Sequence, residues 1–299
     1  MHSPLRANHS KSFVLAFFTL AAVSAAACAD RSSASGSGSS DRGGATSSTA
    51  STTATERVAT PTDRTSAPTQ AEPAPSVASG PPAEVLCITD DRIAIAATLR
   101  VGRSGSTPIV LVHQLASDRS EWEPLVAKLT EAGLTTLAID LRGHGRSVGG
   151  DGATYRAFRD SDWRDTQKDV RAAINFLVRR ATVQAEHVVL IGSSIGGTAC
   201  LAAAAEDPRV SGIVVLSPGR AYHGFDAIVP ASHLGERELL VLHSSEELPS
   251  HETAEVLDRI VAHSTVRAVH GSAHGVAMLA EDPTQLDAVV EFVRAAQPH

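Results

Sequence analysis

The stretch VVLIGSSIGG, residues 188–197, gives the clearest indication of how this chain folds. It begins with four apolar residues, a run typical of a strand that is buried on both faces of a parallel sheet. Glycine and serine follow, and these residues are common in sharp turns. The next segment, TACLAAAA, is rich in alanine, which favours a helix. A buried strand that turns directly into a helix indicates an α/β fold.

The region after residue 82 repeats this alternation of short apolar runs and longer amphipathic segments. Two early runs, 85–89 and 93–100, flank a short polar turn and predict an antiparallel hairpin. We therefore expect an α/β fold with a mostly parallel, eight-stranded sheet flanked by helices. Parallel strands are predicted at residues 109–113, 134–140, 187–192, 212–217, 238–243 and 266–270, and helices at 121–133, 162–180, 195–205, 251–262 and 283–296.

Ser194 stands at the turn, with Gly192 two residues before it and Gly196 two residues after it. A serine hydroxyl is a weak nucleophile until a base takes its proton. A sharp strand-to-helix turn exposes the hydroxyl, and its strained backbone requires small neighbours. The N-terminus of the following helix directs amide groups toward developing negative charge. The spacing predicts Ser194 as the nucleophile, with Ser193 facing away, against the alternative of a purely structural turn.

Four separate motifs in this region resemble those of the α/β-hydrolase family. They are LVHQLASDRSEW at 111–122, DLRGHGRS at 140–147, GSSIGG at 192–197 and SAHG at 272–275. They correspond in that family to the oxyanion loop, a glycine-containing loop, the nucleophile turn and the terminal histidine loop. The resemblance runs from about residue 85 to the C-terminus. It implies a serine hydrolase whose nucleophile, acid and base follow one another in that order along the chain.

The resemblance implies His274 as the general base and a carboxylate after the preceding strand as its partner. His270 is the nearest rival base, but it ends a predicted strand. In the segment HSSEELPS, the position of the family's aspartate falls on Glu247, and Glu246 remains an alternative. This segment departs from the family pattern twice, with Ser244 in place of glycine and glutamate in place of aspartate.

The resemblance also implies an oxyanion hole formed by the backbone amides of Ile195 and Leu115. Gln114 stands where the family usually has glycine, so its amide is the alternative to that of Leu115. Residues 218–237 separate two predicted strands, which leaves little room for a helical cap. We therefore expect no substantial lid domain and a fairly open cleft.

Composition excludes several classes of function. The chain of 299 residues has a net charge of −7 and no basic run, so no nucleic-acid partner is expected. Its three cysteines, Cys28, Cys87 and Cys200, form neither a disulfide framework nor a zinc motif. The expected reaction needs no metal or organic cofactor. The sequence gives no indication of the oligomeric state.

Residues 1–28 have the form of an export signal that ends in AAAC, which resembles a bacterial lipobox. We expect Cys28 to be lipidated, the alternative being an ordinary signal peptide cut after an alanine. Residues 29–82 are rich in Ser, Thr, Ala, Gly and Pro and contain no aromatic residue, which predicts a disordered tether. The hydrolase domain is predicted at 83–299. The expected location is the cell envelope, anchored to a membrane, or else outside the cell.

Together these patterns predict an extracytoplasmic serine hydrolase that cleaves carboxylic esters through an acyl-enzyme. The expected triad is Ser194, Glu247 and His274, and the expected partner is a small-molecule ester or acyl substrate. A peptidase or amidase with the same triad is the nearest alternative, because it uses the same nucleophile and base. A non-catalytic, hydrolase-like binding protein is the alternative from another class.

Overall fold

The structure, a computed structural model, describes residues 80–149, 151–180 and 186–296. Cys28, the predicted export signal at 1–28 and the predicted tether up to residue 79 lie outside these residues. β1 begins at Ala83. No helix within the described ranges is long and apolar enough to cross a membrane.

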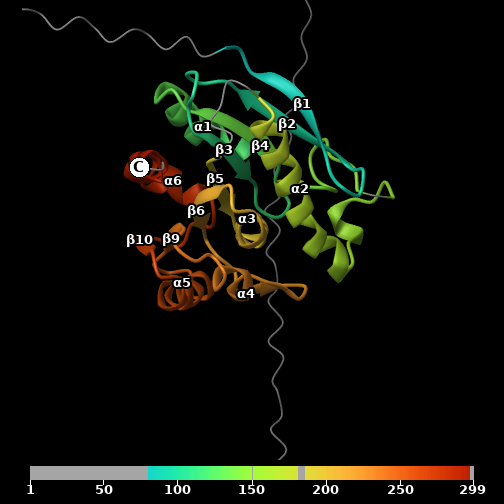
Figure 1. Ribbon diagram of the computed structural model, residues 1–299. Coiled ribbons are helices and arrows are strands. Elements are labelled where there is room, and N and C mark those ends of the chain that lie inside the picture. Colours follow the sequence, from blue (N-terminus) through green and yellow to red (C-terminus); the bar gives the residue numbers. More distant parts are fainter. Residues whose placement is uncertain (1–79, 150, 181–185, 297–299) are drawn as a thin grey trace, which may run out of the picture. The chain divides into compact units, whose positions relative to one another are not determined.

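The described residues form an eight-stranded sheet at the centre of the domain (Figure 1). The first two strands form the expected antiparallel hairpin, and the second pairs antiparallel with β4. The other six strands are parallel to one another, as the apolar runs predict. In spatial order the strands are β1 (Ala83–Ile88), β2 (Ala94–Arg100), β4 (Thr135–Ile139), β3 (Pro108–Val112), β5 (Val188–Ser193), β6 (Val210–Leu216), β9 (Glu238–Ser244) and β10 (Ser264–Val269).

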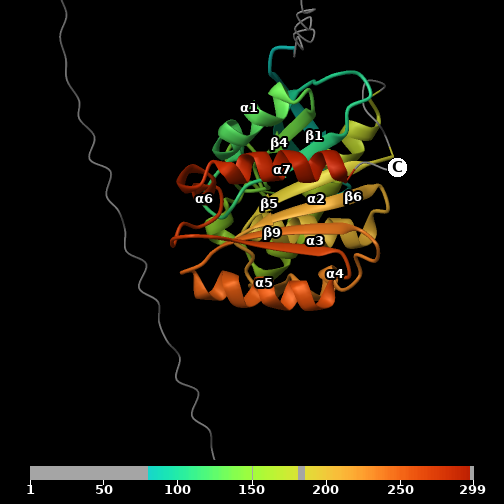
Figure 2. The same ribbon diagram turned by 90° about the vertical axis from the view of Figure 1, so that its left-hand side faces the viewer.

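Helices cover both faces of the sheet, which explains why the central strands are apolar at every position. All residues of β3, β4 and β5 are buried. Figure 2 shows α7 lying across one face, beside α1 and α6. That face carries α1 (Glu123–Glu131), α6 (Ala277–Glu281) and α7 (Thr284–Ala295), and the other carries α2 (Asp160–Val178), α3 (Ile195–Glu206), α4 (Ile228–Ala231) and α5 (Leu248–Ile260).

The connection between β6 and β9 contains small elements in place of a helical cap. β7 (Ala221–Tyr222) and β8 (Phe225–Asp226) form a two-stranded hairpin, and the short helix α4 follows. The sequence pattern predicts neither strand, because two residues are too few to show a period. The pattern also does not predict α6 or the 3-10 turns η1 (Arg119–Trp122) and η2 (Tyr155–Ala157), because three to five residues are too few to show a helical period.

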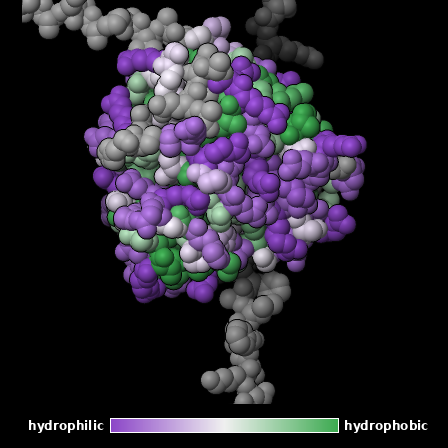
Figure 3. Space-filling view, in the orientation of Figure 1, coloured by the Kyte–Doolittle hydropathy of each residue, from purple (hydrophilic) through white to green (hydrophobic). Residues whose placement is uncertain are grey.

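The exposed face shown in Figure 3 is largely hydrophilic, with apolar side chains in small, separate patches. Large apolar side chains that are exposed include Leu86 and Ile88 on the edge strand β1, at 60% and 61%. Because the six parallel strands share one direction, the loops that follow them meet at a single edge of the sheet. The loops after β3, β5, β9 and β10 carry the predicted site residues.

Candidate active site

Ser194 lies between the end of β5 and the start of α3, in a backbone conformation that is rare for a side-chain-bearing residue. Its φ is +51° and its ψ is −116°, a strained combination typical of functional turns. The flanking glycines are required by close backbone contacts. A Cβ on Gly192 would lie 2.5 Å from the carbonyl oxygen of Gly196, and one on Gly196 would lie 2.4 Å from that of Val112. The glycines therefore allow the tight turn that presents Ser194.

The two adjacent serines have different environments. Ser193 is fully buried, and its hydroxyl donates a hydrogen bond to Oε1 of Gln114 at 3.2 Å. Ser194 is half-buried and lines a pocket, while its amide donates to the carbonyl oxygen of Leu216 in β6 at 2.8 Å. Of the two hydroxyls, only that of Ser194 faces a space that a substrate could enter.

His274 and Glu247 come from the loops after β10 and β9 and lie against each other. Nδ1 of His274 is 2.5 Å from Oε1 of Glu247. The glutamate side chain is 20% exposed and the histidine side chain 45% exposed, so the imidazole remains accessible to solvent. With Nδ1 held by the carboxylate, Nε2 is the ring nitrogen available to accept a proton.

The two rival residues lie elsewhere. Glu246 is exposed, and its backbone amide donates to the carbonyl oxygen of Gly271 at 2.9 Å, which orients the chain without using the carboxylate. His270 is also exposed and follows the end of β10. Neither side chain forms an ion pair with another described residue. The structure thus brings Glu247 to His274, and leaves Glu246 and His270 at the surface.

The backbone on either side of His274 is held by two serines, Ser244 and Ser217, of which the sequence analysis named only Ser244. The hydroxyl of Ser244, at the end of β9, donates to the carbonyl oxygen of Ala273. The hydroxyl of Ser217, just after β6, accepts the amide of Gly275 at 2.8 Å. Ser244 stands where the family usually has glycine, so its hydroxyl gives that departure a physical role.

The amide of Gln114 is already occupied. It donates to Oε1 of Glu121 at 3.0 Å, which removes it as a candidate donor to an oxyanion. The amides of Leu115 and Ile195 donate no hydrogen bond to any residue within the described ranges. Both residues line the pocket beside Ser194. Of the two alternatives in this loop, the structure leaves Leu115 free.

His113, the last buried residue before this loop, fixes its position. The amide of Leu141 donates to Nε2 of His113 at 2.9 Å, so Nδ1 carries the proton and donates to the carbonyl oxygen of Gln114 at 2.7 Å. Burial lowers the pKa of the imidazole, which favours this neutral form. The ring therefore joins the loop after β3 to the loop after β4.

Glu121 is a buried carboxylate beside the predicted oxyanion loop that sequence reasoning did not single out. Its Oε2 atom is buried without a hydrogen-bond partner among the described residues. Burial raises the pKa of this carboxyl, while the Ser117 hydroxyl and the Gln114 amide oppose that shift. An acidic residue near a helix N-terminus is ordinarily explained by the helix dipole, so the sequence carried no separate signal for it.

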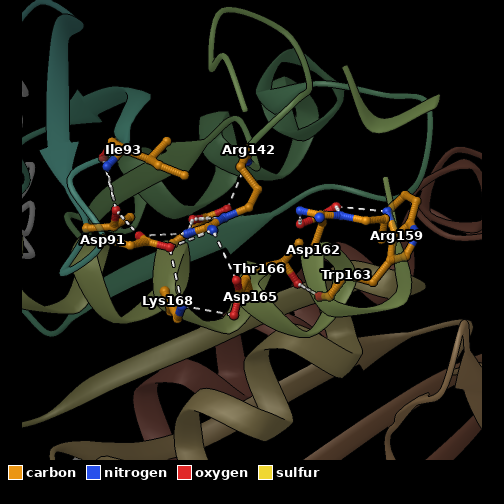
Figure 4. Close-up of polar contacts among 11 residues, drawn as sticks. Asp91, Ile93, Arg142, Arg159, Asp162, Trp163, Asp165, Thr166 and Lys168 are labelled. Atoms are coloured by element: carbon orange, nitrogen blue, oxygen red, sulfur yellow. Dashed lines mark hydrogen bonds and ion pairs between the residues drawn. The ribbon is translucent and has the colours of Figure 1, made fainter. Parts of the chain in front are cut away.

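The loop DLRGHGRS after β4 is held by buried ion pairs. Asp140 is fully buried, pairs with Arg119 of η1 and also accepts that residue's amide at 2.8 Å. Arg142 is 4% exposed and donates to Asp169 of α2 at 2.8 Å and to Asp91 at 2.9 Å. Figure 4 shows the Arg142 side chain between Asp91 and the residues of α2. These pairs fix the loop relative to η1 and α2.

A pocket of about 130 Å³ adjoins Ser194, and Tyr222 of β7 forms part of its wall. A larger hollow of about 500 Å³ lies away from Ser194, and its charged residues, Arg119 and Asp140 among them, already pair with each other. In the part of the chain that the structure describes, no group of three or more His, Cys, Asp or Glu side chains could hold a metal ion.

The chain matches the profile of a family described as the alpha/beta hydrolase fold over residues 107–269, and it belongs to this family. The fold and the relatives support a hydrolytic function. Over 132 residues the chain is 33% identical to an uncharacterized 31.7 kDa protein in the traX-finO intergenic region of Escherichia coli, a match that covers 42% of this chain and 44% of that protein.

A second relative is 2-(acetamidomethylene)succinate hydrolase of Mesorhizobium japonicum. It is 33% identical over 119 residues, which cover 40% of this chain and 38% of that protein. The chain thus spans less than half of the length of these curated relatives. Among solved structures, the Pyrococcus furiosus esterase Pf2001 superposes with a TM-score of 0.61 over 73% of this chain and 92% of that chain, at 15% identity, and so shares the fold.

Proposed function

We propose that the protein is an exported serine hydrolase that cleaves carboxylic esters through an acyl-enzyme. The observation that carries the proposal is the surroundings of Ser194. A strained turn presents its hydroxyl beside two amides that are free to donate, and the His274–Glu247 pair lies on loops at the same edge of the sheet. Nucleophile, base, orienting carboxylate and oxyanion donors are the groups that acyl transfer requires.

The proposed reaction has two halves. Ser194 Oγ attacks the ester carbonyl carbon while its proton passes to Nε2 of His274, and the Leu115 and Ile195 amides donate to the oxyanion. When the carbon–oxygen bond breaks, His274 gives the proton to the departing alcohol and the acyl group stays on Ser194. A water molecule then attacks in the same way and releases the acid. Throughout, Glu247 orients the imidazole and stabilises its cation.

Amide hydrolysis is the second candidate. The Mesorhizobium japonicum relative is named for an acetamido substrate, and the same nucleophile and base serve esters and amides. Matched substrates separate the two candidates. The purified full-length protein is assayed with an ester and an amide that share one acyl group. Turnover of the ester without detectable turnover of the amide supports the esterase, and turnover of the amide at a rate comparable to that of the ester replaces the first candidate with the second.

The first experiment is labelling of the full-length protein with a fluorophosphonate probe, with the modified residue mapped by mass spectrometry. The proposal expects modification at Ser194, which is lost in Ser194→Ala and strongly reduced in His274→Ala. Ser193→Ala is the matched control and keeps the label, because its hydroxyl is buried. Folded protein that takes up no label would overturn the proposed activity in favour of a non-catalytic binding protein.

We further propose that the enzyme works in the cell envelope, attached by a lipid on Cys28. The sequence pattern AAAC before a tether-like segment supports this. In fractionated cells, Cys28→Ser should move the protein from the membrane fraction to the soluble fraction. Continued membrane association of this variant would contradict the lipid anchor.

A further inference from the structure

The pocket beside Ser194 is small, and the side chain of Tyr222 forms part of its wall. Its volume is about 130 Å³, and Thr198, Gly219, Ala221 and Tyr222 line the part that lies beyond the two candidate oxyanion donors. Thr198 lies one turn into α3, and the other three residues belong to the connection that replaces a lid. This pocket therefore lies on the side of Ser194 that α3 and the connection form.

The position of the pocket indicates which part of an ester it holds. The carbonyl oxygen must lie between the amides of Leu115 and Ile195, and the departing oxygen must lie near His274, which protonates it. The acyl chain and the alcohol leave the carbonyl carbon in different directions. No residue of the loop that carries His274 lines the pocket. An acyl chain that extends away from His274 would therefore enter this pocket.

The volume sets a limit on that chain. At about 130 Å³ the pocket is well below the ~300–1,000 Å³ that is usual for small-molecule sites. We therefore expect it to hold short acyl groups such as acetyl or propionyl better than longer ones such as hexanoyl. A chain that does not fit must either displace the wall or stay in water, and both reduce transition-state binding.

The wall at Tyr222 is held in place by aromatic packing. The Tyr222 ring meets the edge of Trp163 at 4.9 Å between centroids, with the planes 84° apart. Trp163 is 2% exposed and is packed in turn against Phe158 at 5.1 Å. His223, the next residue of the hairpin, stacks on Trp163 and pairs with Asp160 at 3.2 Å. The hairpin is thereby packed against the start of α2 on one side, while Tyr222 stays 36% exposed on the other.

We propose that Tyr222, supported by Trp163, is the residue that restricts the enzyme to esters of short acyl chains, acetyl and propionyl above all. This inference rests on the proposed function, because it assigns the acyl side of the same site. In this proposal Trp163 positions Tyr222. The short β7–β8 hairpin thereby limits the space for the acyl chain, without a lid domain.

The test is a series of p-nitrophenyl esters from acetate to octanoate, with kcat/KM measured for the full-length protein. The wild type should prefer acetate or propionate, with hexanoate slower by about tenfold or more. Tyr222→Ala should open the pocket and raise the hexanoate-to-acetate ratio of kcat/KM by about tenfold. Tyr222→Phe keeps the ring and should keep the order of preference.

A second variant, which makes the pocket smaller instead of larger, keeps the test independent of how well Tyr222→Ala folds. Ala221→Leu places a larger side chain in the same pocket and reduces its free volume. It should therefore slow turnover of the propionate and butyrate esters relative to the acetate ester. Val229→Ala is the matched control, since Val229 is 61% exposed on α4 and does not line the pocket. It should leave the chain-length profile unchanged.

The outcomes separate this inference from the proposed function. Turnover with a flat profile, or with a preference for long chains that Tyr222→Ala does not alter, would overturn the inference while leaving the esterase intact. Absence of both turnover and fluorophosphonate labelling would overturn the proposed function itself. A short-chain preference that shifts in both variants as described supports both.

Discussion

The side chain of Gln114 lies directly beneath Gly275. A Cβ atom placed on Gly275 would be 2.0 Å from Oε1 of Gln114 and 2.3 Å from the hydroxyl oxygen of Ser193. The same Gln114 oxygen accepts the Ser193 hydrogen bond. One side chain therefore connects the loop after β3, the end of β5 and the backbone next to His274. A glutamine where the family usually has glycine acts here as packing for the histidine loop.

This contact makes Gly275 sensitive to substitution. Gly275→Ala should lower kcat/KM by about a hundredfold, because the loop must lift and a displacement of about 1 Å at a catalytic group has that effect. The φ of +61° at this position adds strain. The assay is ester turnover alongside the melting temperature. Gly105→Ala is the control, since Gly105 also has a positive φ, +75°, but a Cβ atom placed there would have no neighbour within 4 Å. Equal losses in both variants would contradict the steric explanation.

The pair of adjacent glutamates provides a second prediction. Glu247→Gln removes the charge that stabilises the His274 cation and should reduce kcat by roughly a thousandfold or more. Glu246→Gln alters an exposed side chain and should stay within about twofold. Turnover of the two variants under one set of conditions checks the assignment. The reverse order would transfer the role of the carboxylate to Glu246.

The Arg142–Asp169 pair predicts a large effect on stability. Asp169 is fully buried and receives two hydrogen bonds from the Arg142 side chain and amide, each at 2.8 Å. Arg142→Met would leave that carboxylate without its partner and should reduce the free energy of unfolding by about 3–5 kcal/mol. Denaturant unfolding measures the change. The double variant Arg142→Met with Asp169→Leu should regain most of the lost free energy of unfolding, because neither position of this pair then carries a buried charge.

The control for this prediction is Arg159→Met. Arg159 also pairs with an aspartate of α2, Asp162, but its side chain is 80% exposed, and exposed pairs contribute little. Its midpoint of unfolding should hardly change. A similar loss in Arg159→Met and Arg142→Met would show that burial is not the cause.

His144 predicts a dependence of stability on pH. Burial lowers the pKa of its imidazole to about 4, and Nε2 has no hydrogen-bond partner among the described residues, as suits a neutral ring. In the unfolded chain the pKa returns to about 6.5. The unfolded state therefore binds a proton first as the pH falls from 6.5 toward 4. Over this window His144 should reduce the free energy of unfolding by about 3 kcal/mol.

A variant without the titrating group isolates this effect. His144→Gln can keep a donor toward the carbonyl oxygen of Arg142, which His144 Nδ1 meets at 3.0 Å. Its unfolding free energy should decline less steeply between pH 6.5 and 4 than that of the wild type. Parallel curves for the two proteins would assign the acid sensitivity to other groups, of which the buried His113 is the first to examine.

The fold class and most of the elements follow from the order of residues along the chain. Wholly apolar runs such as residues 109–113 and 187–192 indicate burial on both faces, and the structure has the six parallel strands and the leading hairpin that those runs predict. The turn at Ser194 is also predictable, because strand, small residues and helix are adjacent in the chain. Such features depend on neighbours within a few residues, and the pattern of side chains records them directly.

Which side chains of different loops contact one another, in contrast, depends on the folded structure. The fold brings Glu247 rather than Glu246 to His274, places Glu121 under the amide of Gln114, and packs Trp163 behind Tyr222. These contacts join segments that are far apart in the chain, apart from the few residues between Gln114 and Glu121. A shift of a single residue in a loop redirects a side chain, and the sequence pattern is the same for either register. Only the packed arrangement of strands and loops fixes which neighbouring side chain reaches its partner.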